Sequence, residues 1–137
     1  MNVKFKKRIL YWRGCMFRLK FPEVSQAFEK ILQRAKINFE TVKGEGCCGA
    51  LLFLMGFLED AKKNAARVLK KLKGKDYEAL VTGCPACYRC FSKFYPKFEI
   101  ELPFEVMHVS HMLEELLKEK KLKLKAWDIK VAYHDPC

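Results

Sequence analysis

The chain has 137 residues, 50% of them hydrophobic and 13% aromatic, a composition that excludes an intrinsically disordered protein and provides enough apolar side chains for a core. Lys and Arg number 27 against 16 Asp and Glu, a formal charge of +11, which is compatible with an anionic partner. The longest apolar run, from Ala50 to Leu58, is well short of the ~20 residues that a membrane span needs. The apolar run from Ile9 to Trp12 is too short for a signal peptide, so we expect a cytoplasmic protein, either free or peripheral to a membrane complex.

Short segments rich in β-branched and aromatic residues alternate along the chain with longer segments of helical periodicity. The predicted strands are Ile9 to Trp12, Asn38 to Val42, Tyr77 to Thr82, Phe104 to Val109 and Ile129 to Tyr133. The segments between them are long enough to hold crossover helices, as parallel strands require. We therefore predict an α/β fold, a Rossmann-like and mostly parallel sheet with helices on both faces.

Four helices are expected between and after these strands. The first should begin at Pro22, a favoured first-turn residue, and bury four apolar residues at helical spacing: Val24, Phe28, Ile31 and Ala35. The second runs from Leu58 to Leu72, and its outer face carries five basic residues that we interpret as a solvated surface: Lys62, Lys63, Arg67, Lys70 and Lys71. The third follows Cys84-Pro85 and breaks at Tyr95-Pro96, and the fourth lies near Met112 to Lys121.

The seven cysteines are an odd number, so disulfides alone leave one unpaired. Cys47 and Cys48 are adjacent, and Cys84 and Cys87 form a CxxC, spacings that suit metal ligands better than disulfides. Cys15 follows the first predicted strand, the Cys47-Cys48 pair follows the second, and Cys84 follows the third. Because the carboxyl ends of parallel strands meet at one edge of a sheet, we expect a cysteine site at this C-terminal edge.

Five thiolates in one site exceed the four that a tetrahedral zinc ion takes, which favours iron–sulfur chemistry, with zinc as the alternative. Thiolates form readily at helix N-termini, where Cys84 and Cys87 are expected, and Gly49 is expected to let the backbone approach an inorganic cofactor closely. Cys90 is interpreted as a packing residue outside the ligand set. We predict no ligand role for the histidines, at positions 108, 111 and 134.

Four stretches of this chain resemble a known family: YWRGC at 11–15, CCGALLFLMG at 47–56, VTGCPACY at 81–88 and VMHVSHML at 106–113. The family is the CCG, or cysteine-rich, domain of heterodisulfide reductase B-type subunits and related iron–sulfur oxidoreductases. The resemblance implies that five cysteines ligate a noncubane four-iron four-sulfur cluster or, in some members, a structural zinc: Cys15, Cys47, Cys48, Cys84 and Cys87. It also implies electron transfer or disulfide reduction with partner oxidoreductase subunits, either ferredoxin-like or flavoproteins.

The last residues repeat the pattern of the first, because the strand predicted at Ile129 to Tyr133 leads to Cys137 as Ile9 to Trp12 leads to Cys15. We predict that residues 1–125 form a CCG domain and that residues 126–137 begin a second, truncated CCG repeat whose first ligand is Cys137. A missing second CCG domain would leave the isolated chain inactive as an enzyme.

Two other functions are compatible with the sequence. One is a zinc-stabilised basic binding module without redox activity, although the charge is spread over several helices and the CxxC is not paired with a second, so nucleic acid is not the expected partner. The other is a remnant that has lost its partner domain. Iron and acid-labile sulfide in the reconstituted chain separate the redox function from both.

Overall fold

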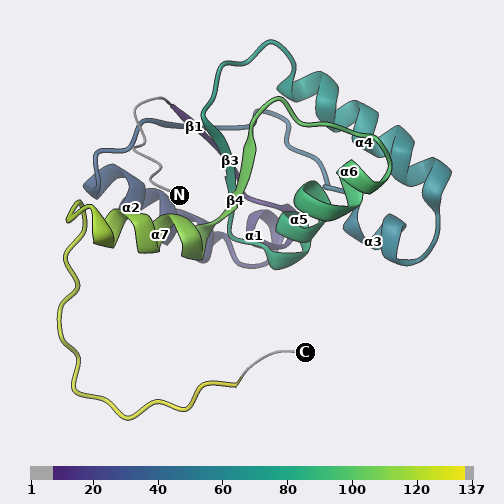
Figure 1. The fold of residues 1–137 in the computed structure, drawn as a ribbon. Helices are drawn as coiled ribbons and strands as arrows, with labels where there is room; N and C mark the ends of the chain where they lie inside the picture. The colour runs from purple at the N-terminus through teal and green to yellow at the C-terminus, as the bar shows by residue number, and fades with distance from the viewer. Residues whose placement is uncertain (1–7, 135–137) are drawn as a thin grey trace.

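Four short strands form one all-parallel sheet in the computed structural model, which describes residues 8–134 (Figure 1). The strands are β1 (Ile9–Trp12), β2 (Phe39–Thr41), β3 (Ala79–Thr82) and β4 (Glu105–His108), in the order β2-β1-β3-β4. Their register aligns Ile9 with Phe39, Leu10 with Leu80, and Ala79 with Glu105. The four strands coincide with the first four predicted from sequence, each lying within its predicted range.

Helices cover both faces of this sheet, as predicted (Figure 1). All four residues of β1 are buried, and successive side chains point to opposite faces. Leu10 and Trp12 pack with residues of α3 (Ala50–Leu54), α4 (Leu58–Leu72) and α5 (Pro85–Arg89), while Ile9 and Tyr11 pack with α2 (Pro22–Arg34) and α7 (Val109–Lys118). This burial on both faces is typical of a parallel sheet.

Two of the predicted helices have the expected start, and a third begins earlier than expected. Helix α2, the first of the predicted helices, begins at Pro22 as predicted and buries Phe28 and Leu32. Val24, however, is 45% exposed, and Ser25 is buried in its place. The predicted bounds of α4 are confirmed, and the five basic residues of its outer face are exposed. The last helix, α7, begins at Val109, earlier than predicted, because the His108 side chain accepts a hydrogen bond from the Ser110 N–H and caps it.

The helix predicted after Cys84 consists of three consecutive parts: α5, the π-helical turn η1 (Cys90–Phe94) and α6 (Tyr95–Lys97). Pro96 has no N–H to donate to the preceding turn, and a π turn is a common way to accommodate such a lost bond in a helix. The helix therefore continues past the predicted break at Tyr95-Pro96. A short helix that the sequence analysis missed, α1 (Cys15–Leu19), follows β1.

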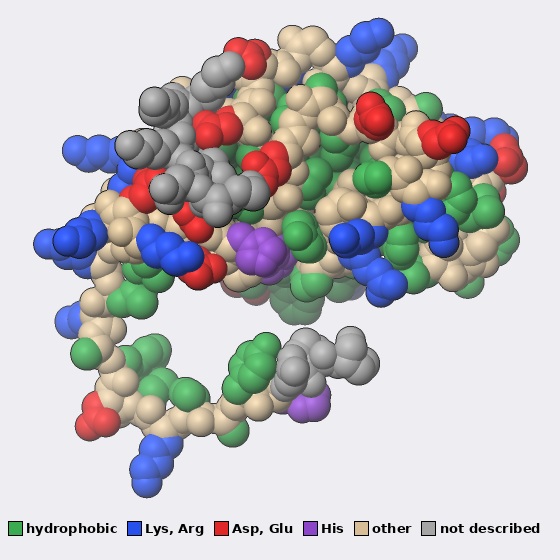
Figure 2. All heavy atoms as spheres, viewed as in Figure 1, with side chains coloured by type: hydrophobic (Ala, Val, Ile, Leu, Met, Phe, Trp, Pro, Cys, Tyr) green, Lys and Arg blue, Asp and Glu red, His purple; other side chains and the backbone are tan. Residues whose placement is uncertain are grey.

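The strand predicted at Ile129 to Tyr133 is wrong in this structure. These residues have no regular secondary structure, and Ile129, Val131 and Tyr133 are 52%, 80% and 85% exposed. The segment leaves α7 and runs clear of the sheet (Figure 1), carrying its hydrophobic side chains on the surface (Figure 2). Cys137 lies outside the described residues, so the second-repeat prediction stays a prediction.

Among residues 8–134, no helix combines the length and the apolar character that a membrane crossing requires.

Candidate metal centre

Three segments bring cysteines to the carboxyl edge of the sheet. Cys15 begins α1 directly after β1, the Cys47-Cys48 pair lies between β2 and α3, and Cys84 precedes α5 after β3. The six described cysteines are free thiols. Cys48, Cys87 and Cys90 are buried, Cys15 and Cys84 are half-buried, and Cys47 is exposed. The site therefore spans the surface and the core.

The thiol of Cys48 is the centre of this group. The thiols of Cys47, Cys87 and Cys90 interact with it, and these interactions hold the pKa of Cys48 well below its ordinary value against the opposing effect of burial. The same interactions raise the pKa values of those three thiols, because each would have to lose its proton beside the Cys48 thiolate. The arrangement concentrates negative charge on one buried sulfur, which is the form that binds metal.

The second thiolate of the group is that of Cys84. A hydrogen bond from the Cys87 thiol, followed by the main-chain N–H groups of Cys87 and Ala86, lowers the pKa of Cys84 to about 6. Cys87 thus interacts with both Cys84 and Cys48, and both neighbours raise the pKa of its thiol. The CxxC and the CC pair share one hydrogen-bonded group of thiols even in the metal-free chain.

The loop that carries Cys47 is held from α4. The carbonyl oxygen of Cys47 accepts a hydrogen bond from Asn64 Nδ2 at 2.9 Å, and the Gly49 N–H donates to Cys47 Sγ at 3.4 Å. Gly49 has a φ of +88°, and a Cβ there would lie 2.9 Å from Asn64 Nδ2. Its positive φ favours glycine at this position, and a side chain there would also displace Asn64.

Cys15 is linked to the group mainly through its neighbour. Its thiol lies close enough to Cys47 for its charge to raise the pKa of the Cys47 thiol, as a smaller contribution after the Cys48 bond and burial. Gly14, the residue before it, has its Cα against the CxxC, since a Cβ at Gly14 would lie 3.2 Å from Cys87 Sγ and 3.5 Å from Cys84 Cβ. The structure therefore brings all five predicted site residues to one place.

Cys90, predicted to be a packing residue, is fully buried at the inner side of the group. Its Sγ donates to the Cys48 carbonyl oxygen at 3.3 Å, and Tyr95 Oη donates to the same oxygen at 3.0 Å. Burial, with the nearby thiols, raises the pKa of the Tyr95 hydroxyl and keeps it a donor. Both residues support the main chain of Cys48 from the core.

The sequence analysis did not predict two residues that hydrogen-bond to the main chain beside the cysteines. Glu45 is 5% exposed, and its carboxyl oxygens accept the main-chain N–H groups of Arg13 at 3.0 Å and Gly14 at 2.7 Å. Burial raises the pKa of this carboxyl, and the two N–H bonds oppose that rise. A single acidic residue between glycines, two positions before the cysteine pair, is the only sequence signal, and it does not identify partners more than thirty residues away.

The other missed residue is His108, at the end of β4. Its Nδ1 accepts the Ser110 N–H at 3.2 Å, so the proton lies on Nε2, which donates to the Gly83 carbonyl oxygen at 3.1 Å. Gly83 is the residue before Cys84. His108 therefore fixes the loop that leads into the CxxC.

A buried hydrogen-bond donor beside the cysteines also fits an iron–sulfur group. Trp12 is fully buried among the residues that pack around Cys48, Cys87 and Cys90, and its Nε1–H has no hydrogen-bond partner among the described residues. A buried donor of this kind suits an acceptor such as a cluster sulfur. In their present positions, no three His, Cys, Asp or Glu side chains within residues 8–134 are arranged around a single metal ion; the thiols contact one another instead.

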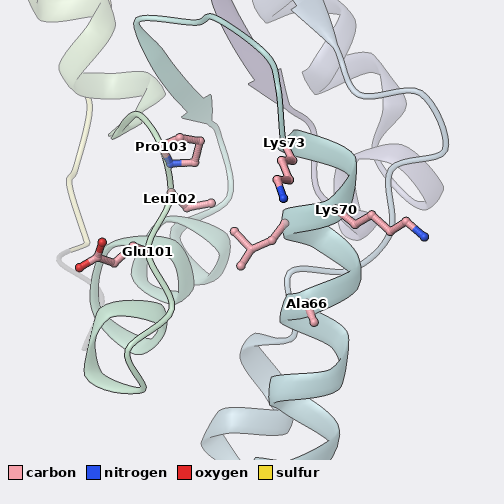
Figure 3. Close-up of a pocket in the computed structure, with 7 residues that line it drawn as sticks. Ala66, Lys70, Lys73, Glu101, Leu102 and Pro103 are labelled. Carbon is pink, nitrogen blue, oxygen red and sulfur yellow. The ribbon is translucent and has the colours of Figure 1, made fainter.

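A groove of about 650 Å³ lies away from the cysteines. It is lined by Ala66, Leu69, Lys70 and Lys73 of α4 and its end, and by Glu101, Leu102 and Pro103. In Figure 3, Lys73 extends into the groove and Lys70 points away from it. Because Pro103 precedes β4 and Lys73 precedes β3, the groove lies at the amino ends of the strands, opposite the cysteine edge. It takes no part in the cysteine site.

Comparison with known proteins matches this chain to one family. The model of the CCG family, described as a cysteine-rich domain, matches residues 9–92, which include β1, β2, β3 and all five predicted site residues. No solved structure matches the chain.

Curated relatives cover nearly all of the chain. One is a component of a dihydromethanophenazine:CoB–CoM heterodisulfide reductase from Methanosarcina acetivorans, 33% identical over 100% of this chain and 35% of its own length. Another, a component of a CoM/CoB fumarate reductase from Methanothermobacter marburgensis, is 28% identical over 95% of this chain and 25% of its own length. An uncharacterized iron–sulfur protein from Methanocaldococcus jannaschii is 28% identical over 96% of this chain and 26% of its own length. The chain thus spans about a third or less of these relatives.

Proposed function

Because the chain belongs to the CCG family of cysteine-rich domains, we propose that it is a subunit, or part of one, of an iron–sulfur oxidoreductase of the heterodisulfide reductase type. Cys15, Cys47, Cys48, Cys84 and Cys87 would hold a noncubane four-iron four-sulfur cluster. The cluster would supply one-electron redox chemistry at the edge of the sheet. The observation that carries this proposal is the single group of thiols that three separate segments bring to that edge.

The residues of this chain prepare the site in three ways. Hydrogen bonds keep Cys48 and Cys84 in the thiolate form that binds iron. Asn64, Cys90 and Tyr95 fix the main chain of the Cys47-Cys48 pair. The buried indole of Trp12 offers an N–H to a sulfur acceptor. Donors of this kind tune the reduction potential of an iron–sulfur group.

The substrate reaction follows the names of the relatives. One belongs to a heterodisulfide reductase, and reduction of a disulfide to two thiols consumes two electrons and two protons. We propose that partner oxidoreductase subunits, ferredoxin-like or flavoproteins, supply the electrons and that a second CCG domain completes the substrate site. The whole reaction would then belong to the assembly rather than to this domain alone.

The test is anaerobic reconstitution of the chain followed by measurement of iron, acid-labile sulfide and zinc. We expect about four irons and four sulfides per chain and an electron paramagnetic resonance signal that responds to oxidation and reduction. Cys84→Ser should lose the group, whereas Glu59→Gln, at an exposed side chain of α4 away from the cysteines, should keep it. One tightly bound zinc without iron would contradict the proposal and favour the zinc-stabilised binding module.

A further inference from the structure

Glu45 is a buried acidic residue in a loop that otherwise carries the cysteine pair. It follows β2 and is separated from Cys47 only by Gly46. A carboxyl group taken out of water is costly unless hydrogen bonds replace its hydration. Here Oε1 accepts the Gly14 N–H at 2.7 Å and Oε2 accepts the Arg13 N–H at 3.0 Å. Both oxygens are therefore used to hold the segment that leads into Cys15.

These bonds are not a by-product of an ion pair with Arg13. The Arg13 guanidinium is turned to Glu29, with Nε 2.8 Å from Oε1, so Arg13 hydrogen-bonds to Glu45 through its main chain. The Arg18 guanidinium, one turn into α1, donates to the main-chain carbonyl oxygen of Glu45. The residue is thus joined to the start of α1 through its side chain and through its backbone.

The contact reaches the third cysteine segment through Gly14. This residue has a φ of +83°, and a Cβ on it would meet Cys87 Sγ at 3.2 Å. Its N–H side is bonded to Glu45 while its Cα side lies against the CxxC. Any movement of Gly14 away from Glu45 would therefore change its packing on Cys87 as well as the position of Cys15.

We propose that Glu45 is a positioning residue that sets the spacing of the three cysteine segments: its own, which carries Cys47 and Cys48, that of Cys15, and, through Gly14, that of Cys84 and Cys87. This inference rests on the proposed function for the ligand role of those cysteines. Glu45 acts through the main chain of Arg13 and Gly14 and is not proposed as a ligand. Its effect is on the geometry of the group that the cysteines hold.

The test compares Glu45→Gln with Glu59→Gln, a matched change at an exposed side chain of α4. Gln has one acceptor oxygen, so one of the two N–H bonds is lost and an amide N–H faces the remaining donor. In the metal-free chain we expect hydrogen exchange at the Arg13 and Gly14 amides to accelerate about tenfold, the loss of a single charge-assisted bond. Glu59→Gln should leave both amides unchanged.

In the reconstituted chain, Glu45→Gln should change the shape of the electron paramagnetic resonance signal and the midpoint potential of the bound iron–sulfur group. A general loss of stability would lower the amount of bound iron without changing either property. If Glu45→Gln does not fold, Glu45→Asp serves instead, because it keeps two acceptor oxygens but shortens their reach. Unchanged exchange together with an unchanged signal would overturn the proposal. If the unaltered chain binds no iron, the proposed function fails, while the exchange measurement still decides whether Glu45 holds the Cys15 segment.

Discussion

The first strand and the last described segment have the same sequence pattern and opposite structures. Ile9 to Trp12 and Ile129 to Tyr133 are both short and apolar, and both lead toward a cysteine. The first is β1, buried at every position between β2 and β3. The second has no strand partner among the described residues and exposes Val131 and Tyr133 almost completely.

The difference shows that the pattern supplies strand propensity, while neighbouring strands and helices supply the stability. The sheet gives β1 hydrogen bonds on both edges and packed helices on both faces. The same neighbours also determine where the chain emerges toward Cys15. A cysteine after a strand is therefore positioned for chemistry only where that strand is part of a sheet.

The largest effect is expected from shortening one apolar side chain in each segment. Leu10→Ala removes a fully buried side chain, and we expect it to lower the free energy of unfolding by about 2–5 kcal/mol. Val131→Ala, at an exposed position, should change it by less than about 0.5 kcal/mol. Urea unfolding of the metal-free chain measures both. Equal losses would mean that the last segment is packed in solution.

Helix starts and buried helix faces could be predicted from the sequence, because residues close together in the chain determine them. Pro22 marks the start of α2, and the spacing of Ala61, Ala65, Val68 and Leu72 gives the buried face of α4. The sequence did not predict α1, which has five residues and no side-chain cap, nor the π turn ahead of Pro96. It predicted a strand at 129–133 because the alternation of apolar residues carries no information on partners.

The site divides in the same way. The five cysteines were found from their spacing and from the rule that parallel strands end at one edge. Glu45 and His108 were not found, because each acts on the main chain of a distant segment, Gly14 in one case and Gly83 in the other. Hydrogen bonds to backbone atoms across such separations leave no pattern in a single sequence.

A second prediction concerns the thiols at the ordered edge. The folded pKa of Cys84, about 6, lies below its ordinary value of 9.0, so between these values the folded chain binds fewer protons than the unfolded chain. The stability of the metal-free chain should therefore rise with pH from about 6 to 9, and this contribution should be lost as the pH falls through 6. Anaerobic unfolding under reducing conditions measures it, and alkylation of Cys84 should show the same midpoint.

The variant Cys84→Ala is the control for this pH profile. It should remove the part of the rise between pH 6 and 9 that Cys84 contributes, and Cys48, whose pKa is also lowered, should keep its own part. The fall above pH 9 should remain, because the raised pKa values of Cys47, Cys87 and Cys90 keep the folded chain protonated there. A profile that is the same with and without Cys84 would show that this thiol has an ordinary pKa.

The smallest expected effect is on the midpoint potential, and it should differ between variants of Trp12 and Trp127, the tryptophans of the two compared regions. Trp12 ends β1 with an unpaired buried N–H, and Trp127 precedes the last segment, 82% exposed. In the reconstituted chain, Trp12→Phe should lower the midpoint potential by the equivalent of one hydrogen bond, about 1 kcal/mol, because the donor that favours the reduced group is gone. Trp127→Phe should leave it unchanged. Equal potentials in both variants would show that Trp12 does not donate to the group.

The most direct measurement is a crystal structure of the anaerobically reconstituted chain with anomalous scattering recorded at the iron edge and at the zinc edge. We expect a group of iron peaks at the carboxyl edge of β1, β2 and β3, with Cys90 behind it on the Cys48 carbonyl oxygen. The sulfur atoms in contact with the iron should be those of Cys15, Cys47, Cys48, Cys84 and Cys87. A single zinc peak held by four of these thiols, or iron peaks elsewhere in the molecule, would contradict this account.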